Sequence, residues 1–414
     1  MTPSVETDDE FRARVRDFLA VNADVEGWRR DRFGRAPDDG ATNEVRLRRN
    51  RRCMTLLHEA GLGALSWPQR YGGQGLTKRH QVIFNQEVAP FSLPLTMFII
   101  GQGMCGPTLL AYGTEEQRDR YLPPLLRGEE IWCQLFSEPG AGSDLASLRC
   151  RADRDGDSWV INGQKVWTSG AHNARFGLLL ARSDAASMRN AGLTAFVVDM
   201  DNPGVDVRGL VEMTGVTRFN EVFFTDCRLA AGSVIGTVGE GWRCAITTLM
   251  NERVSIGTSS PGGYGFPSSV LIDEARRTRR LAEPVLRDEI ARIVVEERLV
   301  EFLGMRVTEA LLAGVEPGPE GSIAKLAGTR LSKRSAALAM EIVGPQAIAW
   351  DPAFPGGRTW ADVTSAAPGL SIAGGTDEIL RNILAERVLG LPRDARPETA
   401  TASQLERTGA DHER

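Results

Sequence analysis

The sequence has 414 residues, of which 42% are hydrophobic and 25% are charged, and its net charge is −5. A chain of this length exceeds a single core and fits two or three domains, and its composition is that of an ordinary globular protein. Because the balance of charge is acidic, we expect no general attraction to nucleic acid or to an anionic membrane.

The cysteines and the N-terminus indicate the cellular compartment. Six cysteines are scattered along the chain, without a CxxC pair and without histidines at ligand spacing, which favours free thiols in a reducing cytoplasm over disulfides or a metal site. The N-terminus lacks the apolar core of a signal peptide. The uncharged segment 88–114 is interrupted by prolines and glycines, so we expect no membrane span there.

The first part of the chain, residues 1–130, is predicted to be a helical domain. Apolar residues at helical spacing predict an amphipathic helix over 8–22. A second helix is predicted over 44–60, and its arginines are interpreted as a solvated face, since no aromatic residues lie between them. Pro123 and Pro124 are predicted to end the helical region.

Residues 131–236 have the period of β-strands. Short apolar runs over 176–182, 193–199, 205–211 and 220–229 are separated by glycine, proline and aspartate, which predicts a small antiparallel barrel or sandwich. Asn162-Gly163, with apolar residues on both sides, predicts a hairpin turn.

The remainder of the chain is predicted to be a helical bundle over 237–393, followed by a disordered tail over 394–414. The predicted helices cover 241–258, 267–280, 284–313, 320–343 and 376–389. The predicted fold class is therefore α+β and multidomain, with an N-terminal helical domain, a middle antiparallel β domain and a C-terminal helical bundle.

The most informative stretch runs from Phe136 to Gly170 and reads FSEPGAGSDLASLRCRADRDGDSWVINGQKVWTSG. Its polar, glycine-rich beginning, Ser137–Asp144, suits a phosphate or the edge of a heterocycle, because small residues let backbone N–H groups approach a ligand. Its end, Trp167-Thr168-Ser169, sets an aromatic face beside two hydroxyl groups.

This stretch resembles the flavin-contacting segment of the acyl-CoA dehydrogenase family. In that family an aromatic residue and a hydroxyl residue precede Glu-Pro, a small pair and Gly-Ser-Asp, and Asn-Gly-x-Lys-x-Trp with a hydroxyl follows; every position is filled here. The resemblance implies a flavoprotein of lipid metabolism that holds FAD, oxidises an acyl-CoA and passes electrons to an electron-transfer flavoprotein. It also implies a homodimer or homotetramer, or a mixed tetramer.

The resemblance also implies roles for particular residues. The FAD-binding residues would be Gln134, Phe136, Ser137, Ser143, Trp167, Thr168, Ser169, Gly375, Thr376 and Glu378. In much of the family the catalytic base is a glutamate directly before Gly-Thr, but here Gly374 precedes Gly375-Thr376. Other members carry the base before an arginine on the first bundle helix, and Glu252-Arg253 match that pair. Glu252 is thus the expected base, and Ser143 and Arg253 are expected to bind substrate.

One departure from the family leaves alternative functions open. The family often reaches the flavin pyrophosphate of a neighbouring subunit through Arg-x-x-Phe-Gly, whereas residues 275–281 read ARRTRRL, without Phe-Gly. The leading hypothesis is an FAD-dependent acyl-CoA dehydrogenase that removes a Cα proton and a Cβ hydride. A flavin oxidase or monooxygenase on the same fold is one alternative, and a non-catalytic subunit of a mixed tetramer is another.

Overall fold

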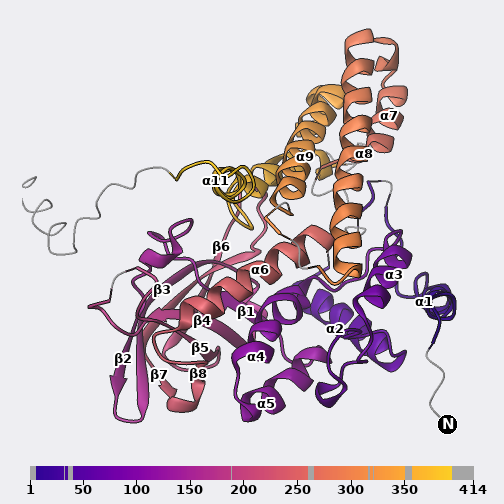
Figure 1. Cartoon of the computed structure of the whole chain (residues 1–414). Coiled ribbons are helices and arrows are strands. Elements are labelled where there is room, and N and C mark those ends of the chain that lie inside the picture. The colour runs from indigo at the N-terminus through magenta and orange to yellow at the C-terminus, as the bar shows by residue number, and fades with distance from the viewer. Residues whose placement is uncertain are drawn as a thin grey trace, which may run out of the picture.

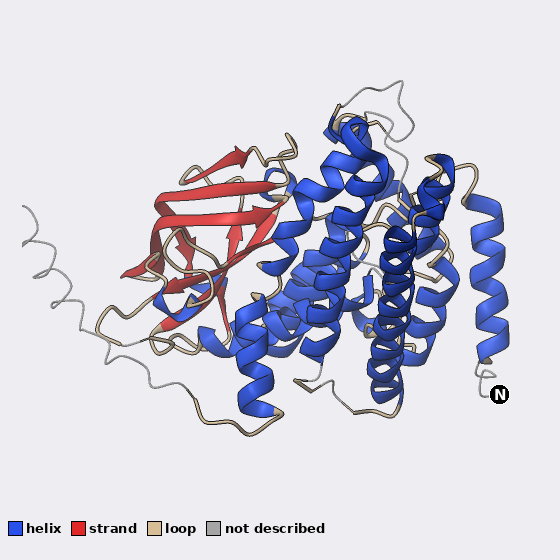
Figure 2. Cartoon of the chain, turned by 90° about the horizontal axis from the view of Figure 1, so that it is seen from above, coloured by secondary structure: helices blue, strands red, loops and turns tan. Residues whose placement is uncertain are grey.

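The computed structural model describes residues 6–31, 33–35, 41–187, 189–259, 265–315, 318–319, 321–349 and 357–393. N-terminal helices, a β-sheet and a second group of helices follow one another along the chain (Figure 1). Seen from above, the sheet lies on one side of the molecule and the helices on the other (Figure 2). This is the predicted three-part fold class, which is confirmed. No helix of the described residues is long and apolar enough to cross a membrane.

The N-terminal domain contains both predicted helices. Its α-helices are α1 (Asp8–Asn22), α2 (Asn43–Glu59), α3 (Lys78–Val88), α4 (Gly106–Tyr112) and α5 (Glu115–Leu126). Thr7 begins α1 with a reciprocal cap, in which its hydroxyl accepts from the Glu10 N–H and the Glu10 carboxylate accepts from the Thr7 N–H.

The prediction that two prolines end the helical region is wrong. Helix α5 includes Pro123 and Pro124 and continues to Leu126. A proline lacks the N–H that would bond one turn back, but its carbonyl still accepts. The Pro123 carbonyl accepts from the Arg127 N–H and the Pro124 carbonyl from the Glu129 N–H, so the prolines belong to the last turn.

The middle domain is one sheet. Its strands are β1 (Trp132–Leu135), β2 (Arg151–Asp155), β3 (Ser158–Ser169), β4 (Phe176–Arg182), β5 (Leu193–Asp199), β6 (Val205–Leu210), β7 (Phe219–Ala230) and β8 (Val234–Ile235). The four predicted strands correspond to β4–β7, and the described residues between 176 and 229 form no helix. The sheet is open, in the order β6-β7-β3-β2-β4-β5-β8 with β1 beside β4. The predicted barrel or sandwich is therefore a single open sheet, in which β4 pairs in parallel with β1 and β2.

Asn162-Gly163 forms no hairpin turn. Both residues lie inside the continuous strand β3, at a shift of register against β7. Gly163 has φ +146°, and a Cβ there would lie 2.8 Å from the Cα of Cys150. A β-bulge requires the same conformational freedom as a tight turn, which is why the sequence signal was ambiguous. The chain turns instead at Gly156, between β2 and β3.

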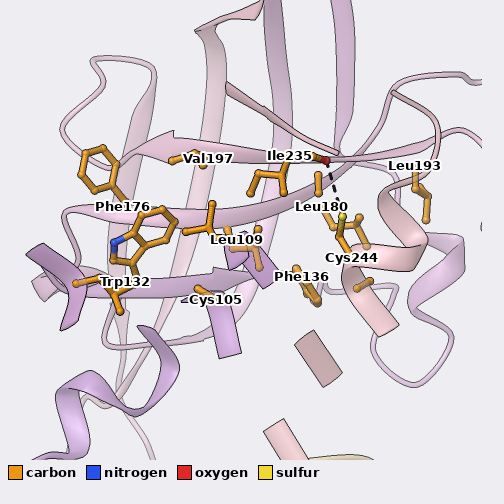
Figure 3. Close-up of a cluster of buried hydrophobic side chains, with 14 of the residues drawn as sticks. Cys105, Leu109, Trp132, Phe136, Phe176, Leu180, Leu193, Val197, Ile235 and Cys244 are labelled. Atoms are coloured by element: carbon orange, nitrogen blue, oxygen red, sulfur yellow. Dashed lines mark hydrogen bonds between the residues drawn. The ribbon is translucent and has the colours of Figure 1, made fainter. Parts of the chain in front are cut away.

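Strands β4 and β5 are buried on both faces. On one face Phe176, Leu180 and Val197 pack with residues of α4 and of the first bundle helix, as Figure 3 shows. On the other face Leu179 and Phe196 belong to a cluster shared with β3 and β7. One hydrophobic cluster thus lies between strands of the sheet, and the second lies between the sheet and the helices.

The C-terminal domain is a helical bundle. Its helices are α6 (Gly241–Ser259), α7 (Ser268–Arg277), α8 (Pro284–Leu312), α9 (Gly321–Val343), α10 (Thr359–Ala366) and α11 (Asp377–Arg387). Five of them match the predicted helices, and α10 is additional. Phe33, from the N-terminal part, packs edge-on against Trp360 with 4.9 Å between ring centroids. The predicted disordered tail, 394–414, lies outside the described residues.

Candidate active site

The glycine-rich loop after β1 is attached to the middle of β3. The Val166 N–H donates to the Ser137 carbonyl at 2.9 Å, and Glu138 and Ala141 exchange backbone hydrogen bonds across the turn. A Cβ added at Gly140 or Gly142 would meet no atom within 4 Å. The loop is therefore fixed at its base and open above its glycines, as a ligand cradle needs to be.

A buried ion pair holds this loop from below. Lys165 is 0% exposed, and its Nζ donates to Glu138 Oε1 at 2.8 Å and to the Phe136 carbonyl at 2.9 Å. The Glu138 carboxylate also accepts from the backbone N–H groups of Arg149 and Cys150 at 2.7 and 2.9 Å. Because both charges are paired and further hydrogen-bonded, the pair is tolerated in the interior and fixes both ends of the loop.

Trp167 occupies an irregular position on β3. The register of β3 against β7 shifts between Lys165 and Thr168, and Trp167 has φ +60°, an uncommon conformation for a bulky residue. Its side chain is 61% exposed and meets only the edge of Phe219 among the described aromatic rings. Such strain is concentrated at functional sites, and the bulge turns an aromatic face outward.

The other predicted flavin residues of the β domain differ in exposure. Ser143 is exposed, Gln134, Ser137 and Ser169 are half-buried, and Phe136 packs in the core under the sheet. Thr168 is buried, and its hydroxyl has no hydrogen-bond partner among the described residues. The hydrogen bond from Val166 to Ser137 places the start of the glycine-rich loop beside Trp167–Ser169, whereas Ser143 lies at the cavity described below.

The predicted base lies on α6, which packs against α4 of the N-terminal domain, β5 of the sheet and α9 of the bundle. Its start is tightly packed, because a Cβ at Gly241 would lie 2.6 Å from the Ala195 nitrogen of β5. Further along, the buried hydroxyls of Thr248 and Thr108 on α4 are 2.8 Å apart. Glu252 follows one turn later and is half-buried. Arg253 lies in the same helix, but its side chain is outside the described part of the structure.

The apolar residues near Glu252 on α6 differ in exposure. Leu249 packs against the core, but Ile246 and Met250 are 41% and 49% exposed. Two of the large apolar side chains that flank Glu252 along α6 are therefore open to solvent in a single chain.

The segment Gly374–Glu378 is held by the bundle. Gly374 and Gly375 have φ +66° and +89°, and the Thr376 hydroxyl caps α11 by accepting from the Ile379 N–H. Lys325 of α9 donates to the Gly375 carbonyl at 3.0 Å, and Glu378 is exposed. The described contacts of this segment join it to α9, whereas the other predicted flavin residues belong to the β domain.

A cavity of about 260 Å³ opens beside the glycine-rich loop. It is lined by Ser143, Asp144, Leu145, Ala146, Arg189, Asn190 and Trp242. Arg189 lies near the end of the connection between β4 and β5, and its Nη2 atom is 3.6 Å from Asp144 Oδ1. Cationic, carboxylate, amide, hydroxyl and aromatic groups therefore surround one hollow at the start of α6.

Sequence reasoning missed several residues that form the site. Glu138 and Lys165 stood inside the recognised motif but were given no role; their signal was a charged residue at an otherwise buried position of each segment. Arg189 and Trp242 gave no signal, because the segments that carry them meet only in the fold.

Comparison with known proteins identifies the family. The acyl-CoA dehydrogenase N-terminal, middle and C-terminal domain models match residues 5–129, 133–227 and 239–389. The acyl-CoA dehydrogenase IpdE1 of Mycobacterium tuberculosis is 40% identical over 393 residues, which cover 94% of this chain and 99% of that protein.

Solved structures give the same result. A steroid acyl-CoA dehydrogenase, Tcur3481–Tcur3483, superimposes with a TM-score of 0.77 at 28% identity, over 94% of this chain and 98% of that one. The ChsE4–ChsE5 complex of Mycobacterium tuberculosis matches with a TM-score of 0.75 at 27% identity, over 95% and 99% of the two chains. This chain therefore belongs to the acyl-CoA dehydrogenase family and is an enzyme of that class.

Proposed function

We propose that this enzyme removes two hydrogens from the α and β carbons of an acyl-CoA thioester, with FAD as cofactor and Glu252 as the base. The observation that carries the proposal is the course of α6. The helix begins at the cavity beside Ser143, where Trp242 is a lining residue, and it presents Glu252 further along. Ten residues of helix span about 15 Å, a length comparable to the extended pantetheine arm of CoA.

Members of the family are FAD-dependent, and the residues present here fit a flavin. An exposed indole on a strained bulge, an open glycine loop and the unbonded Thr168 hydroxyl are features that a planar, hydrogen-bonding ring would use. Ser137, Ser143, Trp167 and Ser169 would hold the ring system, with Gln134, Phe136 and Thr168 behind them. Gly375, Thr376 and Glu378, at the start of α11, would contact the nucleotide part. The flavin, when bound, supplies the acceptor for the Cβ hydride.

The chain's own contribution is positioning and proton transfer. Glu252 takes the Cα proton onto its carboxylate, because position 374 has no side chain that could do so. Arg253 and Ser143 are the residues proposed to bind the substrate. Electrons leave the enzyme to an electron-transfer flavoprotein.

We further propose that the bundle is covered by another chain of the same fold. Helix α8 exposes Val295, Leu299, Phe302 and Met305 along one side, and a hollow of about 320 Å³ lies between this side and α9. Exposed apolar surface of this kind marks an interface. A second copy of this chain is the expected occupant. A related but different chain is the second candidate, which the missing Phe-Gly motif and the ChsE4–ChsE5 complex both favour.

The decisive experiment compares anaerobic bleaching of the flavin in the wild-type enzyme and in Glu252→Gln. The amide keeps the shape of the side chain but cannot accept the proton, so we expect the bleaching rate to fall about 10²–10⁴-fold with substrate affinity roughly retained. Straight-chain, branched and steroid-linked acyl-CoAs form the panel, since one similar structure is a steroid acyl-CoA dehydrogenase.

The control is Asn251→Asp, which adds a carboxylate one position before the proposed base. A Glu252→Gln enzyme that bleaches at nearly the wild-type rate would refute the assignment of the base. Stoichiometric consumption of oxygen during turnover would favour the oxidase alternative over the dehydrogenase. Absence of flavin from the pure protein, restored by co-expression of a related chain, would favour the mixed tetramer.

A further inference from the structure

Arg182, the last residue of β4, makes an unusual set of hydrogen bonds. Its guanidinium directs all of its N–H donors to backbone carbonyls: Leu148 at 3.1 Å, Ser187 at 3.3 Å, Ala191 at 3.2 Å, Ala146 at 2.8 Å and Arg189 at 2.9 Å. A guanidinium carries five donors in a rigid plane, so its full capacity is used. Arg182 is half-buried, and burial lowers its pKa, which the charges of Glu138 and Asp184 partly offset.

The five carbonyls belong to two segments that are far apart in sequence. Ala146 and Leu148 follow the glycine-rich loop, whereas the other three lie in the connection between β4 and β5. Ala146 and Arg189 also line the cavity of about 260 Å³ beside Ser143. The guanidinium thus ties together the two walls of this cavity, although Arg182 is not itself among the lining residues.

The chemistry of the lining points to the nucleotide end of CoA as the ligand. Arg189 supplies a cation for phosphate, Asn190 and Ser143 supply polar groups, and Trp242 supplies an aromatic face. Among the described residues the Arg189 side chain pairs with Asp144, whose Oδ1 lies 3.6 Å from the guanidinium, and the two side chains are 41% and 65% exposed. Exposed ion pairs of this kind are weak, so a phosphate can replace Asp144 as the partner of Arg189.

We propose that Arg182 is a positioning residue for the substrate: it holds the two walls of this cavity at the separation that the nucleotide end of CoA requires, without contacting the ligand. The inference rests on the proposed function, since it takes an acyl-CoA as the substrate. Lysine cannot replace arginine in this role, because an ammonium has three donors and no fixed plane. The walls would then separate while the rest of the site keeps its shape.

The test uses the FAD-loaded Arg182→Lys enzyme. We expect KM for an acyl-CoA to rise about 10-fold while kcat stays within twofold of wild type. With the matching acyl-pantetheine, which lacks the nucleotide, KM should be the same in both enzymes. Flavin content should also be unchanged, because the Lys165–Glu138 pair holds the flavin loop separately. Arg228→Lys, in the exposed ion pair with Asp155 of the same domain, is the matched control and should behave as wild type.

Three outcomes would overturn the inference: an unchanged KM for acyl-CoA, an equal rise in KM for acyl-pantetheine, or loss of flavin in proportion to the loss of affinity.

Calorimetric titration with CoA itself separates this inference from the proposed function. If the wild-type enzyme oxidises no acyl-CoA but binds CoA, and Arg182→Lys binds it about 10-fold more weakly, the function fails and the inference stands. If the wild-type enzyme binds no CoA, the inference fails. If Arg182→Lys does not fold, Arg189→Ala is tested in its place. This variant should have a lower affinity for CoA and an unchanged affinity for pantetheine, and an unchanged affinity for CoA would overturn the inference.

Discussion

Strands at the centre of the β domain bury their apolar side chains within one chain, whereas the long helix α8 of the C-terminal bundle leaves a row of them exposed. Strands β4 and β5 are buried on both faces, and even a charged side chain, Lys165, is fully enclosed and paired. Helix α8 of the bundle instead leaves Phe302 57% exposed, in line with three other large apolar residues. Both the β domain and the bundle carry parts of the candidate site, but in a single chain α8 of the bundle leaves large apolar side chains exposed.

This difference tells which parts of the site are preorganised. The glycine-rich loop and Trp167 are fixed by contacts within the β domain, so their geometry should not depend on assembly. Gly374–Glu378 and the apolar neighbours of Glu252 belong to the bundle, where apolar surface is exposed in a single chain. The site is therefore expected to become fully enclosed only in the oligomer.

The largest effect should come from Lys165→Met, which removes one partner of the buried pair. Glu138 would be left as an uncompensated buried carboxylate, and breaking such a pair costs about 3–5 kcal/mol. We expect the free energy of unfolding, measured by urea denaturation, to fall by this amount and the flavin content to fall with it. The wild-type pair holds the loop inside a single chain, so the loss should not depend on protein concentration.

Arg228→Met is the control for Lys165→Met. It breaks the ion pair with Asp155, in which both side chains are largely exposed, and exposed pairs contribute about 1 kcal/mol or less. If Lys165→Met is no more destabilising than Arg228→Met, the β domain is not held in the way the buried pair implies.

The second effect concerns the bundle. Phe302→Asp places a charge in the middle of the exposed apolar side of α8, and we expect the protein to change from an oligomer to a smaller species in light scattering. Because Phe302 is exposed, the isolated chain should lose little stability, about 0.5 kcal/mol. Gly304→Asp adds the same charge on the opposite side of α8, where a Cβ would meet no atom within 4 Å, and should leave the oligomer intact. Equal molecular masses for wild type and Phe302→Asp would contradict an interface on this side.

Sequence reasoning was most successful where the pattern and the environment agree. The strands β4–β7 and the long bundle helices were predicted nearly to their ends, because continuous apolar runs and helical periodicity both report burial. It failed where one local signal serves two structures. Asn162-Gly163 satisfies a turn as well as a bulge, and Pro123-Pro124 can end a helix or fill its last turn.

The candidate site shows the same limit. The motif located the glycine-rich loop and Trp167. It could not show that Glu138 pairs with Lys165, or that Arg182 donates hydrogen bonds to five carbonyls of two segments. These contacts are set by the register of β3 and by the end of β4, which are tertiary properties. The glycine at 374 was visible in the sequence, but its left-handed conformation was not.

A smaller effect is expected from Trp167→Ala. The indole is 61% exposed, and its one contact with an aromatic ring of the described residues is with the edge of Phe219, 5.8 Å away between ring centroids, so we expect it to contribute little to the fold. Loss of the stacking surface should weaken FAD binding by about 10-fold, as aromatic contacts are worth about 0.5–1.5 kcal/mol beyond the area they bury. Fluorescence titration of the apoprotein with FAD measures this. Trp159→Phe, in the core of the same strand, is the control and should affect stability rather than FAD affinity; unchanged FAD affinity in Trp167→Ala would put the ring elsewhere.

The smallest effect should be the pH dependence that Asp377 gives to the bundle. Burial alone would raise the pKa of this carboxyl, but hydrogen bonds from Ser371 and Lys325 and the charges of Lys325 and Lys333 lower it below its ordinary value of 3.8. A lowered carboxyl pKa contributes stability that is fully present above pH 3.8 and is lost as the pH falls through the folded-state pKa. Asp377→Asn should therefore lower the free energy of unfolding by about 1–2 kcal/mol at pH 7, and the difference from wild type should disappear in acid.

Asp155→Asn, in an exposed pair, is the control and should lower the free energy of unfolding by less than about 1 kcal/mol at pH 7. If the Asp377→Asn difference were the same at pH 7 and pH 3, the carboxylate would not be what ties Gly375 and the start of α11 to α9, and the segment would have to be held by contacts with a second chain, as α8 is proposed to be.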